Sequence, residues 1–247
     1  MTAPENTQVW LVTGANRGIG YQIVHQVATR PNTIVFAGVR NPSKATDLQK
    51  LASSHENLHI LKLESTSEFD AAAAAKEIES STGGLDVVVA NAGIADNWQL
   101  AADVSIESMR RHFEVNVVGV LVLFKAVYHL LQARKTKKFV TMSSLAGQLH
   151  DLFPRVPMTV YGASKAGLNY VTRSMHKDYQ SSGLIAFPIH PGMVDTDMGK
   201  SASDVFEMDK FPVMPEESAA MMIKVIDNAG PEESGRFWSY TGEELEW

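Results

Sequence analysis

The chain is of moderate length, mildly acidic and free of cysteine. Its 247 residues carry a formal net charge of −6 and include no Cys. The lack of Cys excludes disulfides, a catalytic thiol and thiolate metal sites, and the acidic balance argues against a nucleic-acid-binding surface. The first residues lack the basic and apolar regions of a signal peptide. The longest apolar run, Val117–Phe124, is far shorter than the roughly 20 residues of a membrane span. We therefore expect a cytoplasmic protein without nucleic-acid or membrane partners.

Short apolar runs alternate with segments of helical period along the chain. The predicted strands are Val9–Thr13, Thr33–Val39, Leu58–Leu63, Leu85–Ala90, Phe139–Ser143, Ile185–His190 and Arg236–Tyr240. The predicted helices are Gly18–Thr29, Ser43–Ser53, Glu68–Ser81, Ile106–Ala133, Val160–Gln180 and Pro215–Asn228. Several strands are apolar at successive positions, which is typical of parallel strands covered on both faces. The alternation predicts one α/β domain over residues 1–247. We expect a Rossmann-type, doubly wound parallel sheet of about seven strands in the order 3-2-1-4-5-6-7.

Two irregular segments interrupt this alternation, at about 147–159 and 199–215. Each contains two prolines and follows the carboxyl end of a predicted strand. Open α/β sheets bind their ligands at that end of the strands, and long loops in compact domains are usually functional. We expect both segments to be substrate loops.

The first predicted strand runs directly into a glycine-rich turn, Thr13–Gly20, with the spacing G-x-x-x-G-x-G. Glycines here allow a tight turn and a close approach of the backbone to a pyrophosphate, and the next helix offers its free N–H groups to that anion. Glycines that merely fit a strand–helix turn are the alternative interpretation. The position at the first junction of strand and helix favours dinucleotide binding.

The choice of nicotinamide cofactor depends on the end of the second strand. A carboxylate there would bind a ribose 2′-hydroxyl, but the strand ends in Val39-Arg40 with no acid, and Arg17 lies in the glycine-rich turn. Two guanidinium groups can pair with a dianionic 2′-phosphate. Together they favour NADPH.

Tyr161 and Lys165 are four residues apart on one predicted helix, so their side chains share a face. The pair could occur by chance, but the helix follows a strand that ends in Ser143-Ser144 at the same sheet edge. A carbonyl that receives hydride needs a proton from an acid. An ammonium about 4 Å from a phenol, at an effective dielectric near 20, would lower the phenol pKa from about 10 to about 7 if desolvation is ignored.

Six segments in this order resemble the short-chain dehydrogenase/reductase family over the whole chain. They are TGANRGIG from Thr13, ANAG from Ala90, NVVG from Asn116, the serines 143 and 144, YGASK from Tyr161 and PGMVDTDM from Pro191. The resemblance implies an NADPH-dependent ketoreductase. It implies that Tyr161 is the acid, that Lys165 lowers its pKa and holds the nicotinamide ribose, that Ser144 binds the carbonyl and that Asn116 seats a relay water.

The same resemblance implies a set of residues that contact the cofactor. They are Gly14, Asn16, Arg17, Gly18, Ile19, Gly20, Arg40, Glu64, Ser65, Asn91, Ala92, Gly93, Asn116, Tyr161, Lys165, Pro191, Gly192, Val194, Thr196 and Met198. The sequence departs from the family pattern at Ala90, where an Asn is usual, and at Glu64-Ser65, where an Asp and an apolar residue are usual. The segment from Ser144 to Tyr161 is longer than in many relatives. It and the carboxyl-terminal residues resemble the branch of C-factor, sniffer and the fungal norsolorinic acid ketoreductases.

Large apolar side chains are concentrated in the two irregular segments and around the predicted catalytic hydroxyls of Ser144 and Tyr161, while Ser143 is expected to be a packing or supporting residue. They are Leu145, Leu149, Phe153, Met158, Met193, Met198, Phe206 and Phe211. They either pack the loops onto the sheet or line an apolar substrate pocket under a lid. The second interpretation predicts bulky apolar or aromatic ketones as substrates, with Leu145, Leu149, Phe153, Met193, Phe206 and Phe211 in contact with them. Arg155 could bind an acidic substituent, although a loop arginine is more often solvated.

Three further expectations concern metals, partners and the competing function. His55 and His59 are four residues apart but no third ligand is evident, so no metal site is expected. The helices Ile106–Ala133 and Val160–Gln180 are apolar enough to form the family's helix-bundle interface, which predicts a homodimer or homotetramer. The alternative to an enzyme is a non-catalytic NADP(H)-binding sensor or scaffold.

Overall fold

A computed structural model of the chain describes residues 3–4, 6–150, 156–202 and 211–247. The strands are β1 Gln8–Thr13, β2 Thr33–Val39, β3 Leu58–Lys62, β4 Val87–Ala90, β5 Lys138–Met142, β6 Ile185–His190, β7 Phe237–Ser239 and β8 Glu244–Leu245. The α-helices are α1 Gly18–Ala28, α2 Thr46–Ser53, α3 Glu68–Thr82, α4 Ile106–Phe113, α5 Gly119–Gln132, α6 Thr159–Tyr179, α7 Asp197–Lys200 and α9 Pro215–Asn228. Short 3-10 turns lie at Pro42–Lys44, Leu145–Gly147 and Gln180–Ser182.

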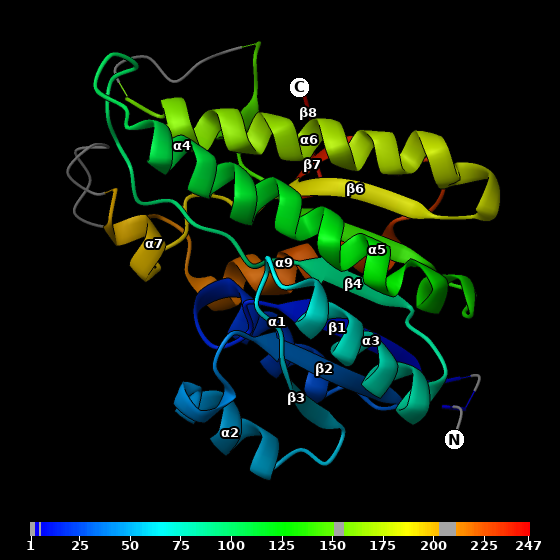
Figure 1. The fold of residues 1–247 in the computed structure, drawn as a ribbon. Coiled ribbons are helices and arrows are strands. Elements are labelled where there is room, and N and C mark those ends of the chain that lie inside the picture. The colour runs from blue at the N-terminus through cyan, green and yellow to red at the C-terminus, as the bar shows by residue number, and fades with distance from the viewer. Residues whose placement is uncertain (1–2, 5, 151–155, 203–210) are drawn as a thin grey trace.

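The strands form one twisted sheet in the order β3-β2-β1-β4-β5-β6-β7-β8 (Figure 1). All neighbours are parallel except β7 and β8, which are antiparallel. The predicted doubly wound parallel sheet and its order 3-2-1-4-5-6-7 are confirmed. The sequence did not predict β8, because two residues are too few to show a strand pattern.

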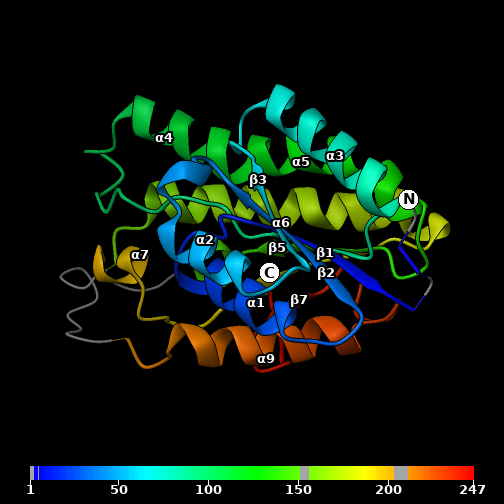
Figure 2. The ribbon, with the colours of Figure 1, turned by 90° about the horizontal axis from the view of Figure 1, so that it is seen from below.

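Helices cover both faces of the sheet, as Figure 2 shows from below. One apolar layer holds α1, α2 and α9 against the sheet, and α9 packs directly on α1. The other layer contains α3, α5 and α6. Strand residues point alternately into the two layers, as in β1, where Trp10 and Val12 face one layer while Val9 and Leu11 face the other. The strands are therefore apolar at successive positions because both faces are buried.

The predicted helix Ile106–Ala133 is a continuous helical run with one wide turn. The residues Glu114–Val118 form a π-helical turn between α4 and α5. The run Ile106–Gln132 is long and apolar enough to cross a membrane, with a mean hydropathy of 1.6. However, the buried side of α5 packs into the sheet layer through Leu123, Phe124 and Val127. This is the packing of a core helix, so its composition does not call for a lipid environment.

Candidate active site

The glycine-rich turn lies at the carboxyl edge of the sheet, against the end of β4. Gly14 has a φ of +64°, and a Cβ there would lie 2.9 Å from Ala92 Cα. A Cβ at Gly20 would lie 2.4 Å from Asn91 Nδ2. Asn91 Nδ2 donates to the Thr13 carbonyl at 2.8 Å. Larger side chains therefore cannot replace these glycines, because the turn and the end of β4 are in direct contact.

The first turn of α1 is available to an anion. No side chain in the described part of the chain caps this helix, and Gly18, with a φ of +56°, opens it. Uncapped N–H groups and the positive end of the helix dipole favour a phosphate group. The glycine cradle and the uncapped helix thus fit the pyrophosphate of a dinucleotide.

Two arginines lie at this edge, and each faces an acid. Arg17 Nη1 is 3.1 Å from Asp197 Oδ2 in α7, and Arg40 Nε is 3.7 Å from Glu64 Oε2 after β3. The Arg17 and Arg40 side chains are 73% and 81% exposed. Exposed ion pairs of this kind are weak, so both guanidinium groups remain open to a stronger anion.

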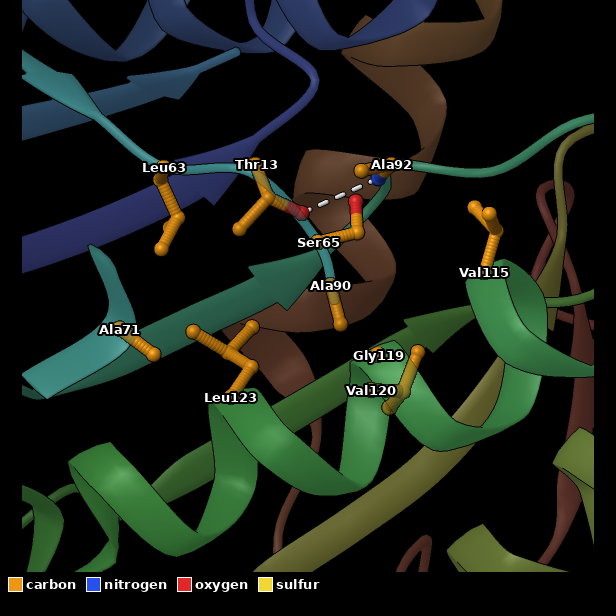
Figure 3. Close-up of a pocket in the computed structure, with 10 residues that line it drawn as sticks. All are labelled: Thr13, Leu63, Ser65, Ala71, Ala90, Ala92, Val115, Gly119, Val120 and Leu123. Atoms are coloured by element: carbon orange, nitrogen blue, oxygen red, sulfur yellow. Dashed lines mark hydrogen bonds between the residues drawn. The ribbon is translucent and has the colours of Figure 1, made fainter. Parts of the chain in front are cut away.

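A small cavity lies beneath the turn, between β1, β4 and α5 (Figure 3). Ala92 N donates to Thr13 Oγ1 at 3.0 Å above it, and Ala90 faces it from β4. Gly119 lets α5 approach the loop after β3, since a Cβ there would lie 2.8 Å from the Ser65 carbonyl oxygen. The cavity measures about 20 Å³, which is room for about one water. It is therefore too small for a substrate.

The predicted catalytic serine and tyrosine lie together at the end of β5. Burial raises the pKa of Tyr161 to about 12, and the nearby Ser144 side chain acts in the opposite direction. The pKa of about 7 expected from the sequence for Tyr161 neglected desolvation, which dominates in this site. The phenol is therefore protonated at neutral pH.

Lys165 lies behind Tyr161 on α6, as the spacing predicts. Its Nζ lies 5.6 Å from the centroid of the Tyr161 ring and donates to the Met142 carbonyl at 2.7 Å. Burial lowers the pKa of Lys165 to about 8. The ammonium is still the main form at neutral pH. Its hydrogen bond goes to the backbone of β5 and not to the phenol oxygen of Tyr161.

Asn116 lies in the π-helical turn and is almost fully buried. Its Oδ1 accepts from Ile94 N at 2.8 Å, and its Nδ2 donates to Ile94 O at 3.0 Å and to Ser164 Oγ at 2.9 Å. Asn116 thus joins the segment after β4 to the helix that carries Tyr161. Gly93 lies beside it, since a Cβ there would lie 3.1 Å from Asn116 Oδ1 and 3.6 Å from Lys165 Nζ.

Ser143 makes different contacts from Ser144. Ser143 Oγ donates to Asn169 Oδ1 of α6, and Thr141 and Thr172 share a hydrogen bond of 2.9 Å one turn away. These buried contacts fix α6 on β5 and thereby set the distance between Ser144 and Tyr161. Ser143 is thus engaged with α6, and the assignment of Ser144 as the catalytic hydroxyl stays a prediction.

A cavity of about 190 Å³ opens beside Ser144 and Tyr161. Its lining is mostly apolar and comprises Ile19, Ala95, Trp98, Ser143, Ser144, Leu145, Ala146, Met158, Tyr161, His190, Pro191, Gly192, Met193, Val194, Thr196, Met198, Gly199, Ala202 and Phe211. Of the predicted substrate residues, Leu145, Met193 and Phe211 line this cavity. Leu149 lies outside it and is 78% exposed. Phe153 and Phe206 lie outside the described residues, as does Arg155.

The family model of the short-chain dehydrogenases matches residues 8–205. The chain belongs to the short-chain dehydrogenase family. It is therefore an oxidoreductase of this family, and the sequence prediction of the family is confirmed.

Individual relatives span nearly the whole chain. The norsolorinic acid ketoreductase of Aspergillus parasiticus is 37% identical over 254 residues, which cover 99% of this chain and 92% of that protein. The NADPH-bound carbonyl reductase from chicken fatty liver superimposes with a TM-score of 0.88 at 32% identity, covering 98% and 100% of the two chains. The carbonyl reductase Sniffer of Drosophila melanogaster gives 0.89 at 27% identity, covering 99% and 100%. The predicted resemblance to the sniffer and norsolorinic acid ketoreductase branch is confirmed.

The cavity beside Ser144 and Tyr161 has no ionised side chain among its described lining residues at neutral pH. His190 is its only described lining residue with a titratable imidazole, and burial lowers the pKa of His190 to about 4. Its Nδ1 accepts a hydrogen bond of 3.4 Å from Leu145 N, which requires the neutral ring on that side. An uncharged apolar cavity favours uncharged ligands.

Trp98 is the lining residue that sequence reasoning missed. It lies in the segment between β4 and α4, which contains no helix or strand. That segment also follows the carboxyl end of a strand, the same criterion that identified the two substrate loops. An aromatic residue in this position was therefore the available signal.

Proposed function

We propose that this short-chain dehydrogenase is an NADPH-dependent carbonyl reductase that acts on bulky apolar or aromatic ketones. The observation that carries the proposal is the position of the Ser144 and Tyr161 hydroxyls in the wall of an uncharged, apolar cavity. Ile19, from the glycine-rich turn, lines the same cavity. A ketone in the cavity would thus lie between the catalytic hydroxyls and the dinucleotide edge of the sheet.

The hydroxyls of Ser144 and Tyr161 would both donate hydrogen bonds to the ketone oxygen. NADPH supplies a hydride when it is bound. As the new C–H bond forms, the π electrons of the carbonyl move to its oxygen, which takes the proton from Tyr161. A phenol with a pKa of about 12 is fully protonated at neutral pH and is ready to act as this acid.

The phenolate left on Tyr161 must be stabilised and protonated again. The Lys165 ammonium, 5.6 Å from the ring centroid, lowers the energy of that anion. Asn116 lies in the π-helical turn, and π-helical turns are often found at functional sites. We assign Asn116 to the proton relay that returns a proton to Tyr161 through water.

Cofactor choice is part of the proposal. Arg17 and Arg40 would bind the 2′-phosphate of NADPH, and the cradle of Gly14, Gly18 and Gly20 would hold the pyrophosphate. The chicken carbonyl reductase at 32% identity is NADPH-bound, which supports the assignment.

Self-association completes the proposal. Large apolar side chains on α4, the π-helical turn, α5 and α6 are exposed: Ile106, Val118, Leu121 and Tyr170. Exposed apolar patches of this kind mark interaction surfaces, so we propose a homodimer or homotetramer that buries this helical face. Sedimentation equilibrium at micromolar concentration tests it, and a monomer would refute it.

A cytoplasmic location stays a prediction.

The experiment that tests the reductase is a carbonyl panel followed by NADPH oxidation. Bulky aromatic ketones, diketones, sugars and short 2-keto acids are compared, with Tyr161→Phe as the inactive control. Turnover of the aromatic ketones supports the proposal. Tight NADPH binding without turnover of any carbonyl would instead indicate a non-catalytic sensor.

A further inference from the structure

The segment between β4 and α4 is fixed at two successive points. Ile94 is held through both its N–H and its carbonyl by Asn116. Two residues later, the Asp96 carboxylate forms an ion pair with Arg111 of α4, and His112 Nε2 lies 3.6 Å from Asp96 Oδ1. A segment without helix or strand thus has a defined path past the active site.

The same segment also contacts the opposite wall of the cavity. Ser201, just after α7, shares its hydroxyl proton between the Met198 carbonyl at 2.7 Å and the Ala95 carbonyl at 3.3 Å. Ala95 and Ala202 both line the cavity. The segment therefore links α4 to the α7 side of the cavity.

Trp98 lies two residues after Asp96, at the end of the part of the segment that these contacts hold. Its ring centroid lies 5.8 Å from that of Tyr161, with an angle of 63° between the planes. Aromatic pairs prefer this edge-to-face arrangement. Trp98 is thus held next to the proton donor, where the group attached to the reacting carbonyl would lie.

The rest of the wall complements an aromatic substrate. Met158, Met193 and Met198 line the cavity together with Phe211. Thioether sulfurs contact aromatic ring edges favourably and adapt to irregular shapes. The cavity therefore offers an indole and several thioethers to a ligand, and its catalytic hydroxyls lie at one side.

We propose that Trp98 determines specificity by selecting ketones whose carbonyl is attached to an aromatic ring, and that Asp96 is the residue that positions it through Arg111. This inference rests on the proposed reductase function and deepens it. An aromatic group beside the carbonyl contacts the indole and gains the aromatic pair interaction, whereas a saturated ring of similar size fills the same space without it.

The test uses a matched pair of substrates, acetophenone and cyclohexyl methyl ketone, which share a carbon skeleton and differ in whether the ring is aromatic and conjugated with the carbonyl; comparing variants cancels the intrinsic difference in reactivity. The measured quantity is the ratio of their kcat/KM values with NADPH. We expect Trp98→Leu to lower this ratio about threefold to tenfold, the range of an aromatic pair interaction, and Trp98→Phe to retain most of it. Leu145→Val, which alters the wall of the cavity but removes neither a ring nor a thioether, is the control and should keep the ratio.

Asp96→Asn tests the positioning role, because it removes the charge and keeps the size of the side chain. We expect it to lower the same ratio by raising KM for acetophenone more than KM for the saturated ketone. Arg111→Ala removes the cation opposite Asp96 and should lower the ratio. Arg111→Lys keeps a cation there and should retain most of the wild-type ratio. An equal loss for both ketones in Asp96→Asn would overturn the positioning role.

The reductase proposal can fail separately. If the wild-type protein turns over no carbonyl of the panel, that proposal is wrong, and calorimetric titration of the two ketones then decides the role of Trp98. Preferential binding of acetophenone that Trp98→Leu abolishes would support the inference. An unchanged ratio in Trp98→Leu, by kinetics or by binding, would overturn it.

Discussion

Arg40 and Glu64 face each other across the ends of β2 and β3, with 3.7 Å between Nε and Oε2. The sequence places no acid at the end of β2, but the fold brings one from the end of β3. The Arg40 side chain is 81% exposed and Glu64 is 35% exposed, so solvent screens this pair and its contribution is small. Glu64 therefore competes only weakly with a phosphate for Arg40.

The first prediction is that Arg40→Ser removes the preference for NADPH. A charge-assisted hydrogen bond contributes about 1.5–3 kcal/mol, so kcat/KM for NADPH should fall by about tenfold to a hundredfold, while kcat/KM for NADH stays nearly constant. Glu64→Gln is the matched control. It frees Arg40 from its carboxylate and should leave NADPH use equal or slightly better. Equal use of NADH and NADPH by the wild-type protein would contradict the prediction.

The second prediction concerns the proton donor. Tyr161→Phe keeps the ring beside Trp98 and removes only the hydroxyl, so it should abolish reduction and leave NADPH affinity nearly unchanged. Loss of a general acid typically costs 100-fold or more in rate. Stopped-flow measurement of NADPH oxidation, with fluorescence titration of NADPH, checks both parts. A variant that keeps a tenth of the wild-type rate would show that another group supplies the proton.

The fold was predictable because its signals are local. Strands with both faces buried are apolar at successive positions, and the turn at Gly14 and Gly20 needs residues without a Cβ. The relation between Tyr161 and Lys165 follows from helical spacing alone. The position of Ser144 follows from the end of a strand, so these parts of the site were available from the sequence.

Other parts of the site depend on contacts between distant residues. The pKa of Tyr161 is set by burial, which the sequence does not show. Trp98 reaches Tyr161 because Asn116 and Arg111 fix its segment, and no periodic pattern records such contacts. Leu149 has the same composition signal as Leu145 but is 78% exposed and lies outside the cavity, where its N–H donates to the Trp247 carbonyl at 3.2 Å. Composition alone could not separate the two leucines.

The third prediction is that Lys165→Met stabilises the protein while it abolishes activity. The pKa of Lys165 is lowered from 10.5 to about 8, so the folded state disfavours the ammonium by about 3 kcal/mol at about 1.4 kcal/mol per pKa unit. This penalty is fully present below pH 8 and disappears as the pH rises toward 10.5. The Met142 carbonyl loses its hydrogen-bond donor, at a cost of about 1 kcal/mol.

Urea unfolding at two pH values tests this balance. At pH 7, Lys165→Met should be more stable than the wild-type protein by about 2 kcal/mol. At pH 10 the difference should vanish or reverse, because the wild-type lysine is then neutral in the folded state. A less stable variant at pH 7 would show that the hydrogen bond to Met142 outweighs desolvation.

The fourth prediction concerns acid stability. The pKa of His190 is lowered from 6.5 to about 4 by burial, so the unfolded chain binds a proton at this residue before the folded one does. Folding stability is therefore lost as the pH falls from 6.5 toward 4, by about 2–3 kcal/mol. His190→Asn keeps an acceptor for Leu145 N and removes the titration. The wild-type protein should lose this much more stability than His190→Asn between pH 7 and pH 4, and parallel losses in the two proteins would refute the assignment.

The last prediction concerns the substrate and rests on Phe211. This side chain is 7% exposed, lines the cavity and packs against α7, where a Cβ at Gly199 would lie 3.2 Å from Phe211 Cδ2. Phe211→Ala removes apolar surface that a bulky ketone would cover, and losing about 1–2 kcal/mol of such burial raises KM by about tenfold. NADPH affinity should change little, because the glycine-rich turn is intact.

Leu149→Ala is the matched control: its side chain is 78% exposed and lies outside the cavity, so KM should not change. Short 2-keto acids should remain poor substrates for all three proteins, since no described lining residue carries a charge at neutral pH to bind a carboxylate. Steady-state kinetics with an aromatic diketone and a short 2-keto acid check these outcomes, and a preference for the keto acid would refute the apolar-pocket proposal.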